Sequence, residues 1–250
     1  MKQSRLNIQH GFTLIELAIV LVIIGVLVGS FIGTIGARID TTHRAETITG
    51  LEEIRQAILG YTYSSPGPNL PCPDCTLACT GGTPNDGMED RNNGACSTGN
   101  NVGNLPWVTL GLGQSDVWNT RYRYWVDADF AEDGSGAGVP FVLTDTGSGR
   151  INTRSPNGAT TPVVATNAVM VVFSHGKNTY GGITLEGDAR PAIPASDVDE
   201  AENADGNAIF VSRSPSGPEA STAGGEFDDI LIWMSDYELK ARMVETGKLP

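Results

Sequence analysis

The sequence predicts an α+β protein in which a long N-terminal helix packs on an antiparallel β-sheet head. Three observations support this fold class. Residues 12–63 follow a helical pattern without interruption, the chain after residue 64 turns to short apolar runs separated by Gly, Asn, Asp and Pro, and the last residues return to helical spacing. A cysteine-rich loop near the start of the head and a short C-terminal helix complete the predicted architecture.

The chain is acidic and has room for one sizeable domain plus an appendage. Its 250 residues include 16 Lys and Arg against 29 Asp and Glu, which gives a net charge of -13. Such a surface repels the phosphate backbone of nucleic acids, and no basic cluster interrupts it. We therefore expect no nucleic-acid partner.

The first half of the predicted helix is apolar enough to be transmembrane. No charged residue occurs from Leu17 to Ala37. At about 1.5 Å per residue, the stretch from 12 to 37 forms a helix of roughly 39 Å, which exceeds a hydrocarbon core of about 30 Å. Its polar residues are Thr13, Glu16, Ser30 and Thr34.

The residues before this helix orient it. Lys2, Arg5 and His10 lie among the first eleven residues, which contain no acid. Positively charged flanks stay on the cytoplasmic side of a membrane. We therefore expect a single-pass helix with an extracytoplasmic head.

The junction between the polar N-terminus and the apolar helix carries the most specific motif of the chain. An ordinary secretory signal is cleaved after its apolar stretch, near Ala37, but the helical pattern continues through that position. Residues 11–17 read Gly-Phe-Thr-Leu-Ile-Glu-Leu. This segment resembles the type IV pilins and the pseudopilins of type II secretion systems, whose leaders end in Gly followed by Phe-Thr-Leu-Ile-Glu. The resemblance covers residues 1 to about 40. The sequence departs from it at Gly33, because many major pilins carry Pro at this position.

The resemblance implies how the chain is processed. A membrane-embedded aspartyl prepilin peptidase cleaves such chains after the residue that is Gly11 here and methylates the new amino-terminus, which is Phe12 here. Residues 1–11 are then the leader peptide, residues 12–63 the transmembrane and assembly helix, and residues 64–250 the extracytoplasmic head.

Glu16 is the one acid inside the apolar half of the helix. A carboxylate there costs about 2.5 to 3.5 kcal/mol on insertion scales, so a partner is expected. Cleavage after Gly11 creates one, because the amine of Phe12 lies four residues earlier on the same helical face. The two charges can pair within one chain or between neighbouring chains, and the resemblance implies that the intermolecular pair sets register during assembly. The alternative is a Glu that lies at the membrane interface near the helix start.

The second half of the helix is amphipathic and continues to about Tyr63. Apolar residues recur with helical period between Ile39 and Leu59, with charged residues between them. Pro66 and Pro68 then end the helix, because proline lacks the N–H donor and disfavours helix in the residue before it.

The head is predicted to contain an antiparallel sheet and a last helix. Ser235 and Glu238 have the spacing of a capping box, Leu239 and Met243 provide a buried stripe, and Gly247 stops the helix. The predicted strands are residues 121–126, 139–143, 168–173, 208–212 and 230–234.

The four cysteines, Cys72, Cys75, Cys79 and Cys96, lie in one loop rich in Gly and Asn. Their even number and the extracytoplasmic location favour two disulfides, and three pairings remain open. The alternative is a zinc site made of four thiolates, since the spacing of Cys72 and Cys75 suits zinc ligands.

Two acidic loops are candidate calcium sites, because clustered oxygen ligands suit a hard cation, although neither loop matches the EF-hand pattern. The same residues also fit an acidic surface loop without a metal. The first loop contains Asn85, Asp86, Glu89 and Asp90, and the second contains Asp197, Asp199, Glu202 and Asp205. Apart from calcium, no cofactor is expected.

The sequence indicates no enzyme. His175 is the one histidine well inside the predicted head, and its neighbour Ser174 points to the opposite face of a strand, so the two do not form a nucleophile and base. No nucleophile elbow, phosphate loop or metalloprotease helix motif occurs in the sequence.

These observations and the resemblance together predict a structural filament subunit, either a minor pilin or a pseudopilin. It would sit in the bacterial inner membrane before assembly, with its head in the periplasm, and then join a periplasmic or surface filament. The implied partners are other pilin or pseudopilin subunits, the prepilin peptidase and the assembly machinery. The alternative is an adhesion or ligand-binding module in which Trp107, Trp118 and Trp125 stack on a ligand.

Overall fold

The structure of the chain is a computed structural model that describes residues 13–98, 101–136, 138–154, 162–218 and 223–250. The side chains of residues 30–35 and 37 are outside this description. The chain divides into two compact units, and the boundary between His43 and Arg44 falls inside the first helix. The second unit, Arg44–Pro250, therefore contains the sheet and the C-terminal part of that helix.

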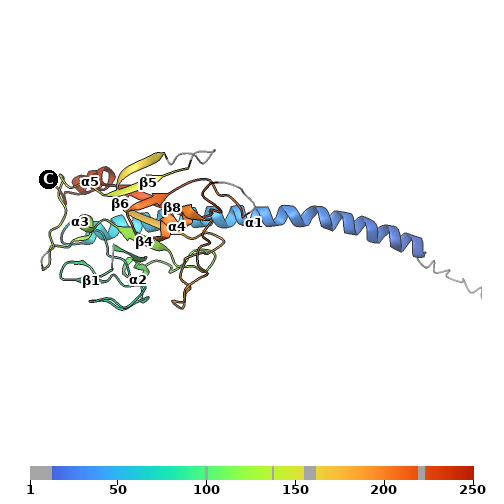
Figure 1. Cartoon of the computed structure of the whole chain (residues 1–250), viewed down its shortest axis with the longest axis horizontal. Coiled ribbons are helices and arrows are strands. Elements are labelled where there is room, and N and C mark those ends of the chain that lie inside the picture. The colour runs from blue at the N-terminus through green and yellow to red at the C-terminus, as the bar shows by residue number, and fades with distance from the viewer. Residues whose placement is uncertain (1–12, 99–100, 137, 155–161, 219–222) are drawn as a thin grey trace, which may run out of the picture. The chain divides into compact units, whose positions relative to one another are not determined.

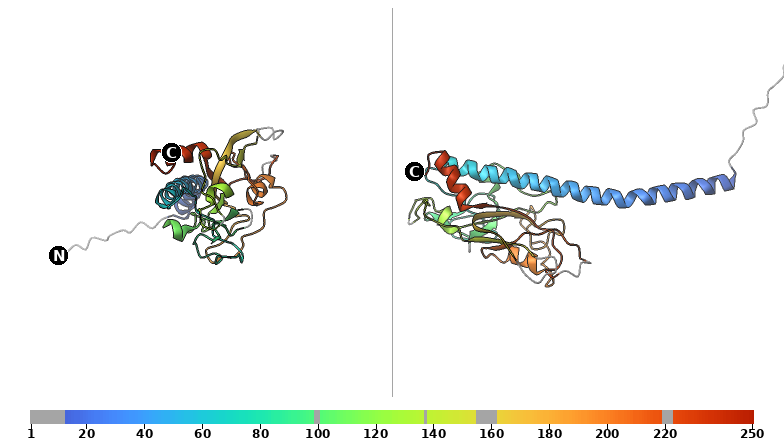
Figure 2. Two further views of the ribbon diagram at one scale, coloured as in Figure 1. Left: turned by 90° about the vertical axis from the view of Figure 1, so that its left-hand side faces the viewer. Right: turned by 90° about the horizontal axis from the view of Figure 1, so that it is seen from above.

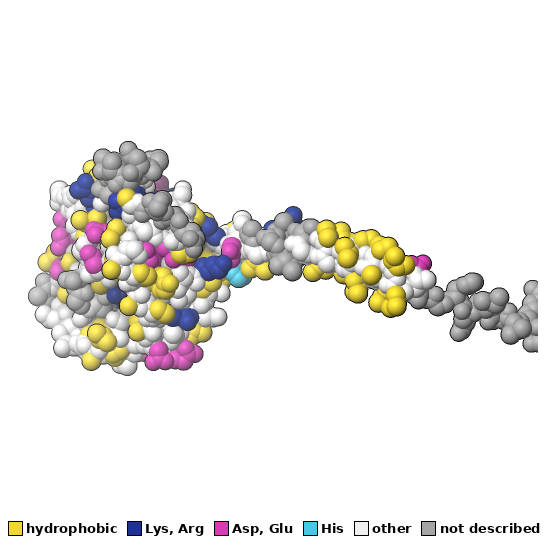
Figure 3. Space-filling view, turned by 45° about the vertical axis from the view of Figure 1, so that its right-hand side comes forward, with side chains coloured by type: hydrophobic (Ala, Val, Ile, Leu, Met, Phe, Trp, Pro, Cys, Tyr) yellow, Lys and Arg dark blue, Asp and Glu magenta, His cyan; other side chains and the backbone are white. Residues whose placement is uncertain are grey.

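Helix α1 (Leu14–Ser64) confirms the helix predicted over residues 12–63. Its first turns expose apolar side chains on all sides, from Leu14 to Val28, and Figure 3 shows them as an almost continuous apolar surface. Within the part of the chain that the structure describes, no helix combines the length and the apolar composition that crossing a bilayer requires.

The C-terminal part of α1 packs into the head. Leu51, Ile54 and Ile58 follow each other at three and four residues, so they share one helical face, and all three are buried. This face contacts the first of two hydrophobic clusters in the head. The helix ends at Ser64, two residues before Pro66, as the proline pattern predicts.

One mixed sheet forms the centre of the head (Figure 1). Its strand order is β3-β4-β6-β5-β7, and β8 also pairs with β6. The strands are β3 (Val102–Asn104), β4 (Arg123–Val126), β5 (Gly149–Asn152), β6 (Val163–Ser174), β7 (Ile209–Val211) and β8 (Ile230–Ser235).

Strand β6 is the hub of this sheet because three other strands pair with it. Its second half pairs with β4 and β8, while its first half pairs with β5. Met170 and Val172 face the cluster that contains α1, whereas Val171 and Phe173 face a second cluster with Trp125. From Ala168 to Phe173 the strand is buried on both faces, and this part of the sequence is a continuous apolar run, as expected for such a strand.

Helix α5 (Asp236–Glu245) confirms the predicted C-terminal helix. Ser235 Oγ accepts a hydrogen bond from the Glu238 N–H at 3.3 Å, as the capping box predicts. Leu239 and Met243 are fully buried. Gly247, with φ 72°, follows the end of the helix in the left-handed conformation that glycine favours. Figure 2 shows α5 beside the C-terminal end of α1, to which an ion pair between Glu238 and Arg55 connects it.

The prediction of a strand at residues 139–143 is wrong. Pro140 has no N–H to give to a sheet, and its neighbours give theirs to carboxylates: Val139 to Glu132 at 2.6 Å and Val142 to Asp145 at 2.7 Å. Phe141 is buried against the core without belonging to a strand. The segment is therefore a loop anchored by one aromatic side chain.

The sheet is also not purely antiparallel, because β5 and β7 pair in parallel. The other four predicted strands correspond to β4, β6, β7 and β8 with shifted ends. The sequence pattern did not indicate β3, β5 or several short elements: β1 (Arg91–Asn92), β2 (Ala95–Cys96), α2 (Trp107–Leu110), α3 (Ala128–Ala131) and α4 (Val198–Ala204).

Candidate functional site

The predicted processing site is only partly within the described residues. Gly11 and Phe12 lie outside them. Glu16 lies in the first turn of α1, where its Oε2 accepts hydrogen bonds from the Thr13 N–H at 3.0 Å and the Thr13 hydroxyl at 2.9 Å. The Glu16 N–H in turn donates to Thr13 Oγ1 at 3.3 Å. The two residues form a capping box, whose Thr-x-x-Glu spacing could have been recognised in the sequence.

The capping box places the Glu16 carboxylate at the N-terminal end of the helix, where the free N–H groups and the helix dipole favour negative charge. Its second oxygen, Oε1, accepts no hydrogen bond from any residue that the structure describes. One oxygen is therefore available for a further donor while the other holds the helix start.

The four cysteines form two disulfides, as predicted. The structure decides the pairing that the sequence left open: Cys72 bonds to Cys96 at 2.05 Å and Cys75 to Cys79 at 2.02 Å. These bonds use all four sulfurs and leave no free cysteine, so the disulfide-bonded protein has no thiolates for the alternative zinc site.

The acids of the first calcium candidate serve the cysteine loop instead of meeting at one point. Asp90 accepts the N–H of Cys75 at 2.7 Å and that of Thr83 at 3.2 Å. Glu89 accepts the N–H of Cys72 at 3.1 Å and pairs with Arg91 at 2.9 Å. These carboxylates replace the backbone partners that a loop without regular structure lacks.

The second calcium candidate is also dispersed. Asp199 is buried between Arg154 and Arg213, which both donate to it at 2.7 Å. Asp197 accepts the Glu226 N–H, and Asp205 accepts two donors from Asn207. Among the described residues, the carboxylate oxygens of Asp197, Asp199, Glu202 and Asp205 do not lie close enough together to bind one metal ion.

The structure instead assembles an acidic cluster that the sequence analysis missed. Carboxylate oxygens of Glu200, Asp228 and Asp229 lie within 4.8 Å of one another. The side-chain amide of Asn178 donates to Glu200 at 2.9 Å, and that of Asn203 donates to Asp229 at 2.8 Å. Oxygen ligands of this kind suit a hard cation, and these three residues are the described carboxylates that could hold one.

Burial controls the protonation of this cluster. It raises the pKa of Glu200 to about 7 and that of Asp228 to about 6, and it raises the pKa of Asp229 well above its usual value. The neighbouring acids add to the shift because like charges in a buried group oppose ionisation. The sequence signal was the Asp228-Asp229 pair before β8, but the contact with Glu200 on α4 depends on the tertiary fold.

His175 and Ser174 are not paired with each other. The Ser174 hydroxyl donates to Asp116 at 2.5 Å and accepts the Gly176 N–H. The His175 ring is buried with its edge against Phe173, and burial together with the charge of Arg123 lowers its pKa to about 3. The histidine is therefore neutral at physiological pH.

The three tryptophans do not form an exposed stacking platform. Trp107 is buried beneath the Arg121 guanidinium, Trp125 is buried in the second hydrophobic cluster, and Trp118 packs against the first. Their placement gives them a role in the core of the head.

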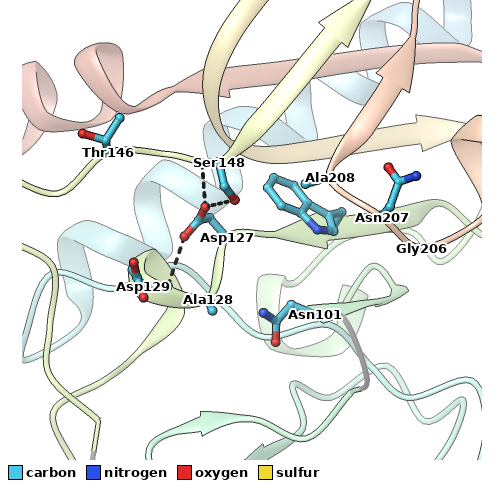
Figure 4. Close-up of a pocket in the computed structure, with 10 residues that line it drawn as sticks. Asn101, Asp127, Ala128, Asp129, Thr146, Ser148, Gly206, Asn207 and Ala208 are labelled. Carbon is cyan, nitrogen blue, oxygen red and sulfur yellow. Dashed lines mark hydrogen bonds between the residues drawn. The ribbon is translucent and has the colours of Figure 1, made fainter.

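A polar pocket of about 400 Å³ opens beside the end of β4 (Figure 4). Asp127 forms one wall, and both of its carboxylate oxygens already accept hydrogen bonds: one from the Asp129 N–H at 3.1 Å and one from the Ser148 N–H at 2.7 Å. Asp129 lies next to it, and burial and the nearby acids raise the pKa of the Asp129 carboxyl. Trp125, Asn101 and Asn207 also line the pocket, which offers hydrogen-bonding groups beside an aromatic side chain.

Comparison with known protein families finds a match in the N-terminal segment of the chain. A family model described as the prokaryotic N-terminal methylation motif matches residues 6–32. This range contains Gly11, Phe12 and Glu16 together with the start of α1. Neither the curated proteins nor the solved structures contain a match to the chain.

Proposed function

The chain carries the N-terminal methylation motif that is the hallmark of type IV prepilin-like and pseudopilin-like proteins, and from this premise we propose that it is a minor pilin or a pseudopilin. In this proposal the chain is a structural subunit with no catalytic role. It is cleaved after Gly11, methylated on Phe12 and assembled into a filament through α1.

The position of the motif supports this proposal. The matched residues 6–32 include the part of α1 whose apolar side chains are exposed from Leu14 to Val28. A water-soluble protein does not leave so large an apolar surface uncovered, so this part of the helix needs lipid or other subunits around it. We propose that the inner membrane covers it before assembly and that neighbouring helices cover it in the filament.

The size of the head supports a minor subunit over a major one. Residues Arg44–Pro250 form a single compact unit with long loops and two disulfides, and such loops are sites of specific contact. The proposed partners are other pilin or pseudopilin subunits, the prepilin peptidase and the assembly machinery. Calcium in the head remains part of the proposal, with Glu200, Asp228 and Asp229 in place of the acids first considered.

The processing step is tested by expressing the full chain with a prepilin peptidase and sequencing the mature N-terminus by mass spectrometry. We expect a chain that begins at N-methylated Phe12. Gly11→Val should keep the leader attached, because the branched side chain blocks the scissile position. Gly36→Ala is the matched control and should be processed normally, because a methyl group there meets no atom within 4 Å. A mature protein that begins at Met1, or beyond Ala37, would overturn the proposal.

A second candidate function is a head that binds a surface ligand, and the pocket of Figure 4 is the observation that favours it. The carboxylate of Asp129 and the amides of Asn101 and Asn207 suit a polyhydroxylated ligand such as a sugar, and Trp125 contributes only the small exposed part of its ring. Asp129→Asn should then abolish adhesion while filaments still form. Normal adhesion of this variant would exclude the pocket.

A further inference from the structure

A second pocket, of about 300 Å³, lies between the Cys75–Cys79 loop and one edge of the sheet. Its volume is at the lower end of the range for small-molecule sites, roughly 300 to 1,000 Å³. The five residues from Cys75 to Cys79 form one wall, and the other residues that line it are Ser97, Thr98, Val102 and Arg123.

Arg123 is the one charged residue that lines this pocket, and it has no partner. Strand β4 carries it between Asn104 of β3 and Phe173 of β6, neither of which is an acid. It makes no ion pair or hydrogen bond through its side chain with any described residue. Burial lowers the pKa of its guanidinium, and no carboxylate offsets this effect.

Several other partly or fully buried arginines of the head have acceptors, and the charge of half-buried Arg44 lies near that of Asp228. Arg91 pairs with Glu89, and Arg154 and Arg213 both pair with Asp199. Arg121, although it has no acid partner, donates to the carbonyl of Asn85 at 3.1 Å. A guanidinium has five N–H donors, so a half-buried one without a protein acceptor can offer these donors to an anion in the pocket.

Two hydroxyl groups of the same pocket are also unsatisfied. Ser97 Oγ and Thr98 Oγ1 are buried and have no hydrogen-bond partner in the structure, and the Thr98 residue is only 9 % exposed. Buried polar atoms of this kind are nearly always paired with protein, water or ligand. Both residues line the same pocket as Arg123, and hydroxyl groups can donate hydrogen bonds to anions.

We propose that this pocket binds a small oxyanion, held by the Arg123 guanidinium and by the hydroxyls of Ser97 and Thr98. Carboxylate, phosphate and sulfate share the chemistry that these donors recognise, and the planar fork of arginine fits two oxygens of any of them. Val102 and Ala78 provide apolar wall for the carbon frame of a larger ligand.

The Cys75–Cys79 disulfide gives this pocket a fixed wall. The bond closes a loop of five residues, and the Cys75 N–H is held at 2.7 Å by the buried Asp90 carboxylate. Asp90 accepts a second N–H, from Thr83, so both of its carboxylate oxygens accept hydrogen bonds from the backbone of the loop. His175 adds no charge beside Arg123, because its pKa of about 3 leaves it neutral.

The test uses the full chain purified in detergent micelles and in a chloride buffer. Acetate, phosphate and sulfate are titrated separately, and binding is followed by calorimetry and by the melting temperature. We expect saturable binding of at least one of them. A preference for acetate assigns a carboxylate ligand, and a preference for phosphate or sulfate assigns a tetrahedral one.

Arg123→Gln should weaken binding by about 10- to 100-fold, since it removes the charged donor. Ser97→Ala combined with Thr98→Val should weaken it by about 3- to 10-fold. Arg150→Gln is the matched control, because Arg150 is an exposed arginine in a strand of the same sheet, and it should bind as the wild type does.

The stability of the variant separates a binding role from a structural one. An arginine without a protein partner contributes nothing to the fold that glutamine cannot replace, so without anion Arg123→Gln should melt at or above the wild-type temperature. Arg123→Lys keeps the charge but loses the fork, and it should bind at an intermediate strength. Failure of all three anions to saturate the wild type, or equal binding by wild type and Arg123→Gln, would overturn the proposal.

Discussion

Glu16 illustrates how one side chain can serve two states of a protein. In the structure it closes the capping box with Thr13 and so fixes the start of α1. In the proposed mature subunit the same carboxylate meets the amine of Phe12. The two uses are compatible, because the capping box occupies Oε2 and leaves Oε1 open to a second donor.

The charge and the cap of Glu16 can be separated by mutation. We expect both Glu16→Ala and Glu16→Gln to reduce incorporation into filaments by at least tenfold, because neither can neutralise the amine. Glu16→Gln keeps the capping geometry, whereas Glu16→Ala also loses a cap of about 0.5 to 1 kcal/mol. Incorporation is measured as the fraction of subunit in sheared filaments.

Membrane insertion of both variants, measured by fractionation, should equal that of the wild type. Incorporation of Glu16→Ala at the wild-type level would contradict the assembly role, and normal incorporation of Glu16→Gln alone would show that the cap matters and the charge does not.

The buried acids Glu200 and Asp228 make the stability of the head depend on pH. Their pKa values of about 7 and about 6 in the folded chain exceed the ordinary values of 4.5 and 3.8. The folded state therefore binds more protons than the unfolded state between these limits. The stabilisation is fully present below about pH 4 and is lost as the pH rises through 6 and 7.

Glu200→Gln should flatten this pH dependence, because glutamine cannot ionise. We expect the wild type to lose on the order of 1 to 3 kcal/mol of unfolding free energy from this cluster between pH 4.5 and 7. Chemical denaturation at several pH values measures the slope. Glu245→Gln is the control, since Glu245 is 65 % exposed. An unchanged slope in Glu200→Gln would show that another group is responsible.

At the scale of elements, the two disulfides stabilise loops of very different length. Cys72 and Cys96 are 24 residues apart and tie the cysteine loop to β2, whereas Cys75 and Cys79 are only 4 apart. A longer closed loop removes more entropy from the unfolded chain, although real disulfides follow this rule only approximately.

Replacing Cys72 and Cys96 by serine should therefore cost about 3 kcal/mol of unfolding free energy, and replacing Cys75 and Cys79 about 2 kcal/mol. Denaturant titration of each double variant measures both losses. The second pair should in addition weaken anion binding, because it forms a wall of the pocket. A larger loss from the short pair would mean that native packing, not loop entropy, dominates.

Elements with a strong local pattern could be predicted from the sequence. Helix α5 has its capping residue, its buried stripe and its terminal glycine within thirteen residues, so no distant contact is needed to recognise it. The run at 139–143 has the apolar composition of a strand, but Pro140 and two acceptor carboxylates, Glu132 and Asp145, remove its N–H groups from any sheet. Composition alone did not reveal those acceptors.

At the scale of the whole molecule, the division at His43 and Arg44 separates two kinds of surface. In the first unit, the described apolar side chains of α1 are exposed, whereas in the second unit the apolar side chains from Leu51 to Leu59 that face the head are buried and Ile48 is still exposed. One continuous helix thus changes from a surface that needs an external partner to one that the head already covers.

The sequence by itself determined the methylation motif, the long helix and its end, and the presence of two disulfides, and it predicts the leader junction at Gly11 and Phe12. Each of these depends on residues close together in the chain or on composition. The tertiary structure decided which cysteines pair, which acids meet and which arginine lacks a partner. Glu200 lies close to Asp228, and Arg123 and Ser97 line one pocket, only because the sheet and its loops bring distant segments together, and no local pattern encodes that proximity.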